Sequence, residues 1–275
     1  MSQMEQLCTD LREEADALRA LMTGAGLAPD RVTPFMGWTV RNSLSHIVTI
    51  DRLATLAFCD IPKAAEERRA FAAGTTQPST APIDRYRAIA DYEEARLGLL
   101  SWEQLIAAWD IGLDQLIAAA RAAGDDARVE WFGGAMRAPS LLSARHMEVW
   151  AYGQDVFDAA EADRPDGERL RNVVEFGLKT FGFSFANRGE PVPTTKPYLA
   201  LISPGGVEWT WNDPAAGDRI TGSARDLALV TTQRRHVADT DLTVEGPVAA
   251  RWMAIAQSIA GVPMDGPAPG RLACG

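Results

Sequence analysis

Cysteine is scarce in this chain, and its few copies form no pattern. The 275 residues include three cysteines, which are scattered and show no CxxC spacing: Cys8, Cys59 and Cys274. Such a set builds neither a disulfide framework nor a thiolate metal site, and it is typical of a reducing compartment. We therefore expect a cytoplasmic protein.

Long apolar runs and dense positive charge are also missing. No apolar stretch approaches the roughly 20 residues of a membrane-spanning helix, and the N-terminal segment is acidic and amphipathic, unlike a signal peptide. The formal net charge is −10, and the most basic clusters, Arg68–Arg69 and Arg234–Arg235, are too short for a nucleic-acid footprint. Phosphate loops, dinucleotide fingerprints, HExxH and GxSxG motifs do not occur. These absences argue against membrane and nucleic acid as partners.

Hydrophobic periodicity is the strongest positive signal. The hydrophobic fraction of 47% is that of a folded protein. Apolar residues recur at helical spacing and predict helices over about 4–22, 40–59, 83–124 with a break near 101, 139–164 and 166–188. From residue 189 onwards YLALIS and VEWTWN alternate around a Pro-Gly-Gly turn, followed by further short strands and helices. We predict an α+β chain, with a helical bundle over 1–188 and a small α+β domain over 189–275.

Local signals refine this picture at three places. Thr39 is a good N-cap for the helix over 40–59, with Asn42 at its third position. Residues 129–140 (VEWFGGAMRAPS) combine glycines, a proline and large apolar residues, which predicts an ordered, packed loop. The segment 261–275 is rich in Gly and Pro and is expected to be loosely held.

The helix over 143–158 carries a stripe of polar residues. At about 100° per residue, four polar side chains fall within an arc of roughly 80°, with large apolar residues on the other sides. These four are Arg145, Glu148, Tyr152 and Asp155. Buried charged groups must be paired, bound to metal or catalytic. The stripe is therefore the candidate active site.

His46 is the natural partner of this stripe, because facing helices of a bundle project site residues inward. It lies among apolar residues of the helix over 40–59. Together with Glu148 and Tyr152, which follows Glu148 by four residues, it forms a candidate open site with three ligands, as catalytic zinc uses.

Three other polar residues are expected to lie outside the site. His146 is about 160° from Glu148 on the helical wheel, which indicates a structural role. His236 is expected at the C-terminal end of a helix, interacting with its dipole. Asp51 lies well off the face of His46 and is expected to be exposed.

Several segments resemble a known family. GWTVRNSLSHIVTID, WFGGAM, ARHMEVWAYGQDV and TQRRHVADTDL are similar to the actinobacterial branch of the mycothiol-dependent maleylpyruvate isomerase-like proteins, within the DinB/YfiT-like metal-binding four-helix bundles. The resemblance implies a C-terminal module like sterol-carrier domains. It also implies one divalent metal, typically zinc, which activates a low-molecular-weight thiol or water. His46 matches the first ligand and Glu148 the second, but Tyr152 stands where the family has its third ligand, a histidine.

The resemblance and this departure together give the functional expectation. We expect a small-molecule isomerase or cyclase, of secondary metabolism, that works without metal in the old metal pocket. Tyr152 would act as the acid and Glu148 as the base, His46 as hydrogen-bond donor or proton shuttle, and Arg145 and Asp155 would complete the catalytic set.

Two alternatives stay open. One is a zinc-dependent isomerase or a thiol transferase using mycothiol, with the metal on His46 and Glu148. The other is a non-catalytic protein that binds a small ligand. In each case we expect a small-molecule partner, and a homodimer is compatible with the sequence.

Overall fold

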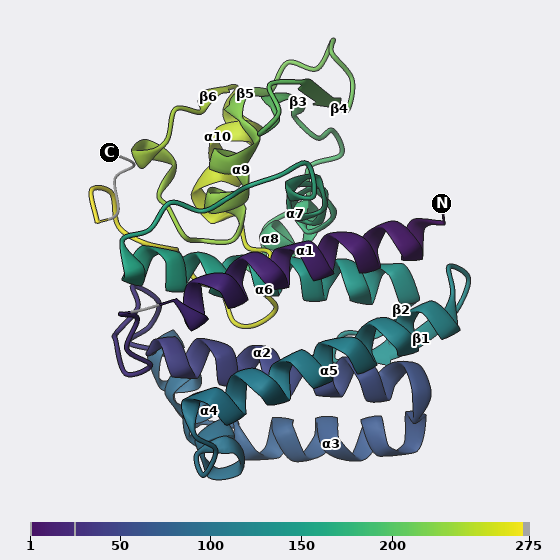
Figure 1. The fold of residues 1–275 in the computed structure, drawn as a ribbon. Coiled ribbons are helices and arrows are strands. Elements are labelled where there is room, and N and C mark those ends of the chain that lie inside the picture. The colour runs from purple at the N-terminus through teal and green to yellow at the C-terminus, as the bar shows by residue number, and fades with distance from the viewer. Residues whose placement is uncertain (1, 25, 272–275) are drawn as a thin grey trace. The chain divides into compact units, whose positions relative to one another are not determined.

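The core of the first part of the chain is a bundle of long helices (Figure 1). The computed structural model describes residues 2–24 and 26–271. The bundle consists of α1 (Gln3–Thr23), α2 (Val40–Cys59), α5 (Trp102–Ala123) and α6 (Ala138–Ala160), which pack against one another. Leucines of α1 at helical spacing, Leu7, Leu11 and Leu18, are buried as the periodicity predicts.

Two shorter helices enclose α2 further. α3 (Ile61–Gly74) and α4 (Pro82–Leu97) both pack against α2, which also contacts α5 and α6. The start of α2 has the predicted capping box, in which Thr39 and Asn42 satisfy each other's backbone N–H groups. Because α2 has neighbours on several sides, more than one of its faces is buried.

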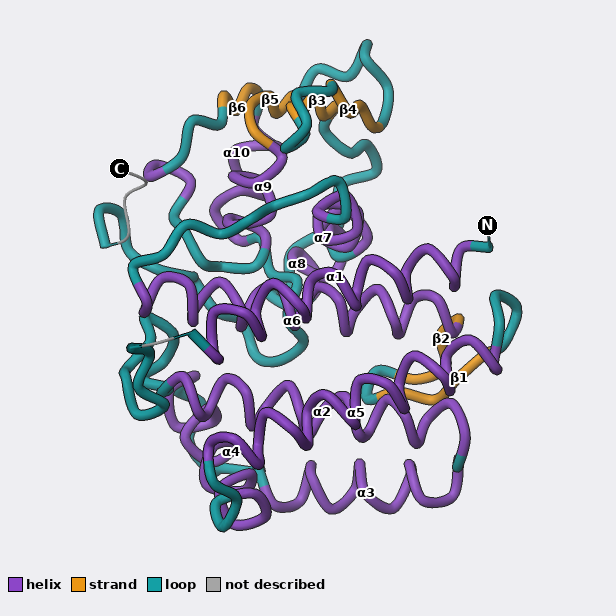
Figure 2. The backbone as a smooth tube through the Cα atoms, in the orientation of Figure 1, coloured by secondary structure: helices purple, strands orange, loops and turns teal. Residues whose placement is uncertain are grey.

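The segment between α5 and α6 is a β-hairpin (orange, Figure 2), so the prediction of an ordered, packed loop missed its two strands. β1 (Arg128–Trp131) pairs antiparallel with β2 (Gly134–Arg137), and Trp131 lies opposite Gly134. Gly134 has a φ of 105°, a conformation that a side chain would disfavour. The two glycines therefore mark a tight hairpin turn.

The boundary between the two compact units lies earlier than expected. The units are Met1–Arg164 and Pro165–Gly275, so residues 165–188 group with the second unit instead of the first. The physical reason is packing: α7 (Leu170–Lys179) lies against α9 (Ala224–Thr231). α8 (Phe181–Ala186) packs against α10 (Pro247–Ile255). The periodicity of this segment predicts a helix but not the partner that the helix covers.

The second unit contains a four-stranded sheet with the order β4-β3-β5-β6. Its strands are β3 (Tyr198–Ile202), β4 (Glu208–Trp211), β5 (Arg219–Ser223) and β6 (Thr243–Glu245). β3 and β4 form the predicted antiparallel hairpin, and β3 runs parallel to β5. Leu199, Leu201 and Ile220 are fully buried, and Figure 1 shows α7, α9 and α10 on the same side of the sheet. The predicted α+β organisation, a helical unit followed by an α+β unit, is confirmed.

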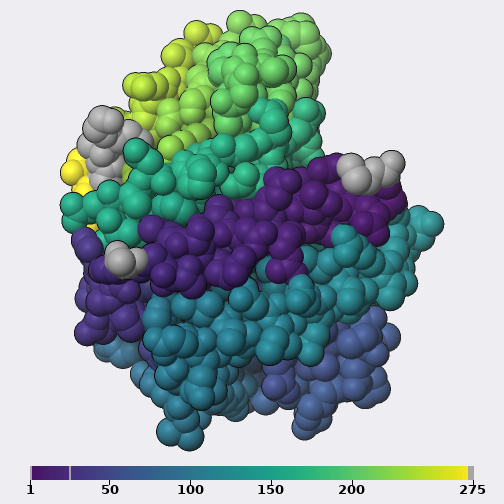
Figure 3. Space-filling model, in the orientation of Figure 1, coloured from purple at the N-terminus to yellow at the C-terminus, as the bar shows by residue number. Residues whose placement is uncertain are grey.

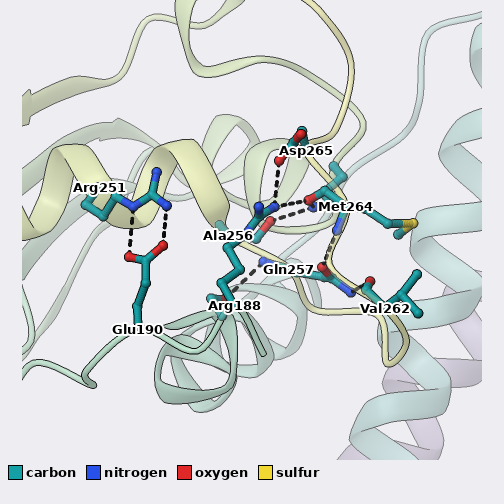
Figure 4. A network of polar contacts seen from close by, with 10 residues as sticks. Arg188, Glu190, Arg251, Ala256, Gln257, Val262, Met264 and Asp265 are labelled. Carbon is teal, nitrogen blue, oxygen red and sulfur yellow. Dashed lines mark hydrogen bonds and ion pairs between the residues drawn. The ribbon is translucent and has the colours of Figure 1, made fainter. Parts of the chain in front are cut away.

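The chain after α10 is held more firmly than its composition suggests (Figure 4). Gln257 Oε1 accepts from the backbone N–H of Met264 at 3.0 Å. Arg188 donates to the carbonyl of Met264 at 2.6 Å and pairs with Asp265 at 2.8 Å. The expectation of a loose segment is therefore wrong for residues 261–265; residues 272–275 lie outside the described residues.

His236 also differs from its expected role. It is the N-cap of a short 3₁₀ helix, η1 (Val237–Asp239), and its Nδ1 accepts from the backbone N–H of Ala238 at 3.0 Å. It caps the start of a helix instead of the end.

Ion pairs join α1 and α5 on the surface of the bundle. In Figure 3 the surfaces of α1 (purple) and α5 (blue-teal) lie side by side, and ion pairs such as Arg121–Glu5 at 3.0 Å join them. These side chains are exposed, so each pair contributes little to stability. No helix within residues 2–24 and 26–271 is long and apolar enough to cross a membrane.

Candidate functional site

Almost every residue of α6 is buried, including three of the four residues of the predicted polar stripe. Arg145 has no exposed surface, Tyr152 is 1% exposed and Asp155 is 2% exposed. Glu148 is the most accessible member, with 17% of its side chain exposed. The stripe is thus a set of buried charges that needs partners from neighbouring helices.

His46 receives one such partner from α4, a residue that the sequence analysis did not single out. Its Nδ1 lies 2.8 Å from Oε1 of Glu93, whose side chain is completely buried. Glu93 follows Tyr86 and Ile89 at helical spacing, and both of these are buried. That spacing places a carboxylate on the apolar face of α4, which is the signal that could have identified it.

The other edge of the His46 ring faces α6. Nε2 lies 3.7 Å from Oε2 of Glu148. The same Glu148 oxygen is 2.6 Å from Nη1 of Arg145, one turn earlier on α6. The structure therefore brings together the predicted residues His46, Glu148 and Arg145.

Asp51 completes the group, contrary to the expectation that it is exposed. It is 1% exposed, and its Oδ1 accepts from Nε of Arg145 at 2.8 Å. The prediction considered only the His46 face of α2, whereas α2 is enclosed on several faces. We call Asp51, Glu93, Glu148, His46 and Arg145 the buried charge cluster.

Opposing effects set the pKa of the two partly accessible members. Burial lowers the pKa of His46, but the carboxylates of Glu93 and Glu148 outweigh it and raise the pKa to about 9. Burial raises the pKa of Glu148, but Arg145 and His46 outweigh it and lower the pKa to about 2. At neutral pH an imidazolium therefore faces a carboxylate.

The two fully buried carboxylic acids shift the other way. Burial raises the pKa of Glu93, and the nearby His46 offsets this only in part. Burial likewise raises the pKa of Asp51 against the opposing effect of Arg145. The cluster thus holds carboxyl groups of clearly different acidity, a feature typical of functional sites.

Tyr152 packs as an aromatic wall of the site. Its ring stacks on Trp38 with centroids 5.4 Å apart and meets the His46 ring edge-on at 4.8 Å. The Trp38 indole is fixed by a hydrogen bond from Nε1 to the carbonyl of Tyr86 at 2.9 Å. Tyr152 is therefore positioned to limit the movement of the imidazole.

Asp155 and His146 lie apart from the charge cluster. Asp155 follows Glu148 by seven residues, which corresponds to about 10 Å along the axis of α6. His146 is fully buried, with Nε2 3.9 Å from Oε2 of Glu14 on α1. Glu14 also pairs with Arg164 at 2.5 Å, so this second buried group joins α6 to α1.

A cavity of about 520 Å³ opens at the N-terminal end of α2 and along α4, and none of the five residues of the charge cluster lines it. Trp38 lines it and also packs against His46, with ring centroids 5.2 Å apart. The turn before Trp38 has positive φ at Met36 (46°) and Gly37 (75°), a conformation that non-glycine residues rarely adopt. Charged and polar side chains line the cavity: Asp30, Arg41, Asn42, Arg87, Asp91 and Glu94.

The donor set does not fit a three-ligand metal site. Among the described residues, no three His, Cys, Asp or Glu side chains are grouped so that they could hold one ion. His46 and Glu148 supply two donors, and the expected third position is the neutral phenol of Tyr152, a poor zinc ligand. We therefore derive no chemical step through a metal.

Comparison with known proteins identifies the family. The family model for the mycothiol maleylpyruvate isomerase N-terminal domain matches residues 11–157, more than half of the chain. The chain belongs to this family. The resemblance carried by the motifs around His46 and Glu148 is thereby confirmed.

Relatives of this mycothiol maleylpyruvate isomerase family member span nearly the whole chain. Two uncharacterized proteins of Mycobacterium tuberculosis, from strains H37Rv and CDC 1551, are 35% identical over 261 residues, covering 94% of this chain and 96% of theirs. Among solved structures, the mycothiol-dependent maleylpyruvate isomerase and a histidine-to-alanine mutant of it match with a TM-score of 0.54 at 17% identity, covering 90% of this chain and 98% of theirs. This structural match shows the fold alone.

Proposed function

We propose that this protein is an isomerase of a small molecule that works by proton transfer, with His46 as the acid and Glu148 as the base. The observation that carries the proposal is the opposed pair itself, His46 Nε2 and Glu148 Oε2 at 3.7 Å. Family membership supports a small-molecule enzyme, and the chemistry of the pair supports acid–base catalysis.

The charge states at neutral pH are those that the two roles require, although both pKa values lie far from the operating pH at which proton transfer is most efficient. With pKa values of about 9 and about 2, His46 carries a proton to donate and Glu148 is ionised at neutral pH. Both side chains retain some exposure, whereas Arg145 has none. In this proposal the substrate contacts His46 and Glu148 directly, and Arg145 acts through Glu148.

An isomerisation leaves the number of protons on the substrate unchanged. His46 Nε2–H donates one proton, and the Glu148 carboxylate removes another from a different atom of the substrate. Because the two groups face each other, the proton on Glu148 can return to the His46 ring and restore both groups. Glu93 keeps Nδ1 of His46 hydrogen-bonded throughout, so that Nε2 is the nitrogen that exchanges the proton.

In this proposal Tyr152 is a positioning residue instead of the acid that the sequence suggests. Its ring is buried against Trp38 and His46, which favours a role in holding the imidazole. Asp155, two turns away, takes no part in the proton transfer.

A thiol-assisted isomerisation is the second candidate, because the solved relatives are named mycothiol-dependent. A protonated imidazole favours the thiolate form of a neighbouring thiol. His46 would supply that charge here, and Glu148 would orient the imidazole.

The test incubates the protein in D₂O with maleylpyruvate or other small unsaturated or α-keto acids, with and without mycothiol. It measures conversion of the acid together with the exchange of solvent protons into it. Conversion that falls by about 10²–10⁴-fold in His46→Gln and in Glu148→Gln, but not in the exposed control Glu66→Gln on α3, is the expected result. Conversion that survives both substitutions would refute the proposed roles. Activity only with mycothiol would select the second candidate, and tight binding of these acids without any conversion would favour a binding protein.

A further inference from the structure

The most unusual member of the buried charge cluster is Arg145. Its side chain is fully buried between α6 and α2, with Nε 2.8 Å from Asp51 and Nη1 2.6 Å from Glu148. A guanidinium stays protonated at every accessible pH, so the positive charge is permanent. Two carboxylates from different helices thus balance one internal cation.

This placement bears directly on metal binding at Glu148. A zinc ion would lie about 2.0–2.2 Å from the carboxylate oxygen that it uses. On Oε2 it would then lie within about 5 Å of Nη1 of Arg145, because the nitrogen is itself 2.6 Å from that oxygen. Two cations so close in a buried site repel each other with little screening.

The remaining donors do not offset that repulsion. Tyr152, one turn after Glu148, lies in the aromatic wall with Trp38. Glu93 contacts Nδ1 of His46, the ring edge opposite to the one that faces Glu148. Metal-bound histidines usually have a hydrogen-bond partner, so the bond between Glu93 and His46 does not argue against a metal. The permanent positive charge of Arg145 beside Glu148 does argue against one.

We propose that Arg145 is the resident cation of this site and takes the electrostatic role that a divalent metal has in a three-ligand site. The chain therefore holds no stoichiometric zinc on His46 and Glu148. This inference deepens the proposed function and rests on its acid–base interpretation of the cluster. Metal content is measured without substrate. A zinc measurement can therefore refute this inference while the proposed reaction stands, and an activity assay can refute the proposed reaction while this inference stands.

The experiment starts with the full-length wild-type protein. The protein is treated with a chelator, equilibrated with zinc, desalted and analysed for zinc per chain by atomic emission. We expect well below one zinc per chain. The inference would be overturned if the wild-type protein held about one zinc per chain and His46→Gln lost that zinc. This comparison does not depend on the folding of any further variant.

Two substitutions then separate the missing ligand from the resident cation. Tyr152→His supplies the third donor, and Arg145→Met removes the charge but keeps much of the volume. The double variant is expected to bind zinc at least about 100-fold more tightly than Tyr152→His alone, measured by competition with a chromophoric chelator. Equal affinity of the two would overturn the inference, because Arg145 would then exclude nothing.

The matched control uses a second arginine whose side chain is buried. Arg164 pairs with Glu14 and has a side chain with no exposed surface. Arg164→Met combined with Tyr152→His should bind zinc no better than Tyr152→His alone. Arg145→Lys with Tyr152→His keeps the charge and should also stay weak, so tight zinc binding in either variant contradicts the inference. Circular dichroism establishes that each variant is folded.

Discussion

The raised pKa of His46 makes a measurable link between pH and stability. An ordinary histidine has a pKa of 6.5, and Glu93 and Glu148 raise that of His46 to about 9. At about 1.4 kcal/mol per pKa unit, the cluster stabilises the folded protein by about 3 kcal/mol through this one proton. Because the pKa is higher in the folded state, this contribution is fully present below pH 6.5 and is lost as the pH rises through about 9.

Glu93→Gln is the perturbation that isolates this effect. The amide keeps the size of the side chain and can still accept from Nδ1, but it removes one of the two carboxylates that oppose burial. The pKa of His46 should fall towards or below its ordinary value. The loss of stability between about pH 6 and about pH 10 should shrink accordingly.

The assay is NMR titration of the imidazole Cε1–H signals, with His46→Gln assigning the resonance, together with urea unfolding over the same pH range. The neighbouring exposed residue provides the control, Glu94→Gln, which should leave the titration unchanged. A wild-type His46 that titrates near its ordinary value would refute the reasoning. An equal shift in Glu94→Gln would do so as well.

Three further predictions concern stability and thiol chemistry. Arg145→Met should lower the free energy of unfolding by about 3–5 kcal/mol at neutral pH. The loss should be smaller in acid, because the raised pKa of Asp51 lets that carboxyl become neutral there. Urea unfolding curves that show no loss would contradict the buried pairing. Gly177→Ala should destabilise by about 1–3 kcal/mol, because its Cβ would lie 2.8 Å from Oγ1 of Thr231. Gly112→Ala, where a Cβ meets nothing within 4 Å, should be neutral or stabilising, and thermal melts of the two variants test both expectations. Finally, burial raises the pKa of the Cys8 thiol to about 11. Iodoacetamide near pH 8 should therefore label the exposed Cys59 and leave Cys8 unmodified, as read by peptide mass spectrometry. Similar labelling of both would show that Cys8 is not protected.

Most helices of this protein could be predicted from its sequence, because local periodicity and caps determine them. The capping box at Thr39 and Asn42 formed as predicted. The polar stripe of α6 was predicted as buried, and the structure agrees for Arg145, Tyr152 and Asp155, whereas Glu148 is partly exposed. A helical wheel is sufficient for such features, since it depends only on residues within a few turns.

Features that depend on packing between distant segments could not be predicted in the same way. The sequence assigned residues 165–188 to the bundle, whereas α7 packs against α9 of the second unit. It also described residues 129–140 as a loop, although the glycines there form a hairpin turn. A helical or extended pattern carries no information about the surface that it covers.

The candidate site shows the same division. Composition, motifs and the family resemblance pointed to His46, Glu148 and Arg145, because residue type and helical spacing are properties of the chain itself. Only the tertiary structure brought Glu93 and Asp51 to them, at 2.8 Å in each case, from positions 47 and 94 residues away from their partners in the sequence. A buried charge is tolerated only where a neighbouring element supplies its partner, and that partner is decided by how the helices pack.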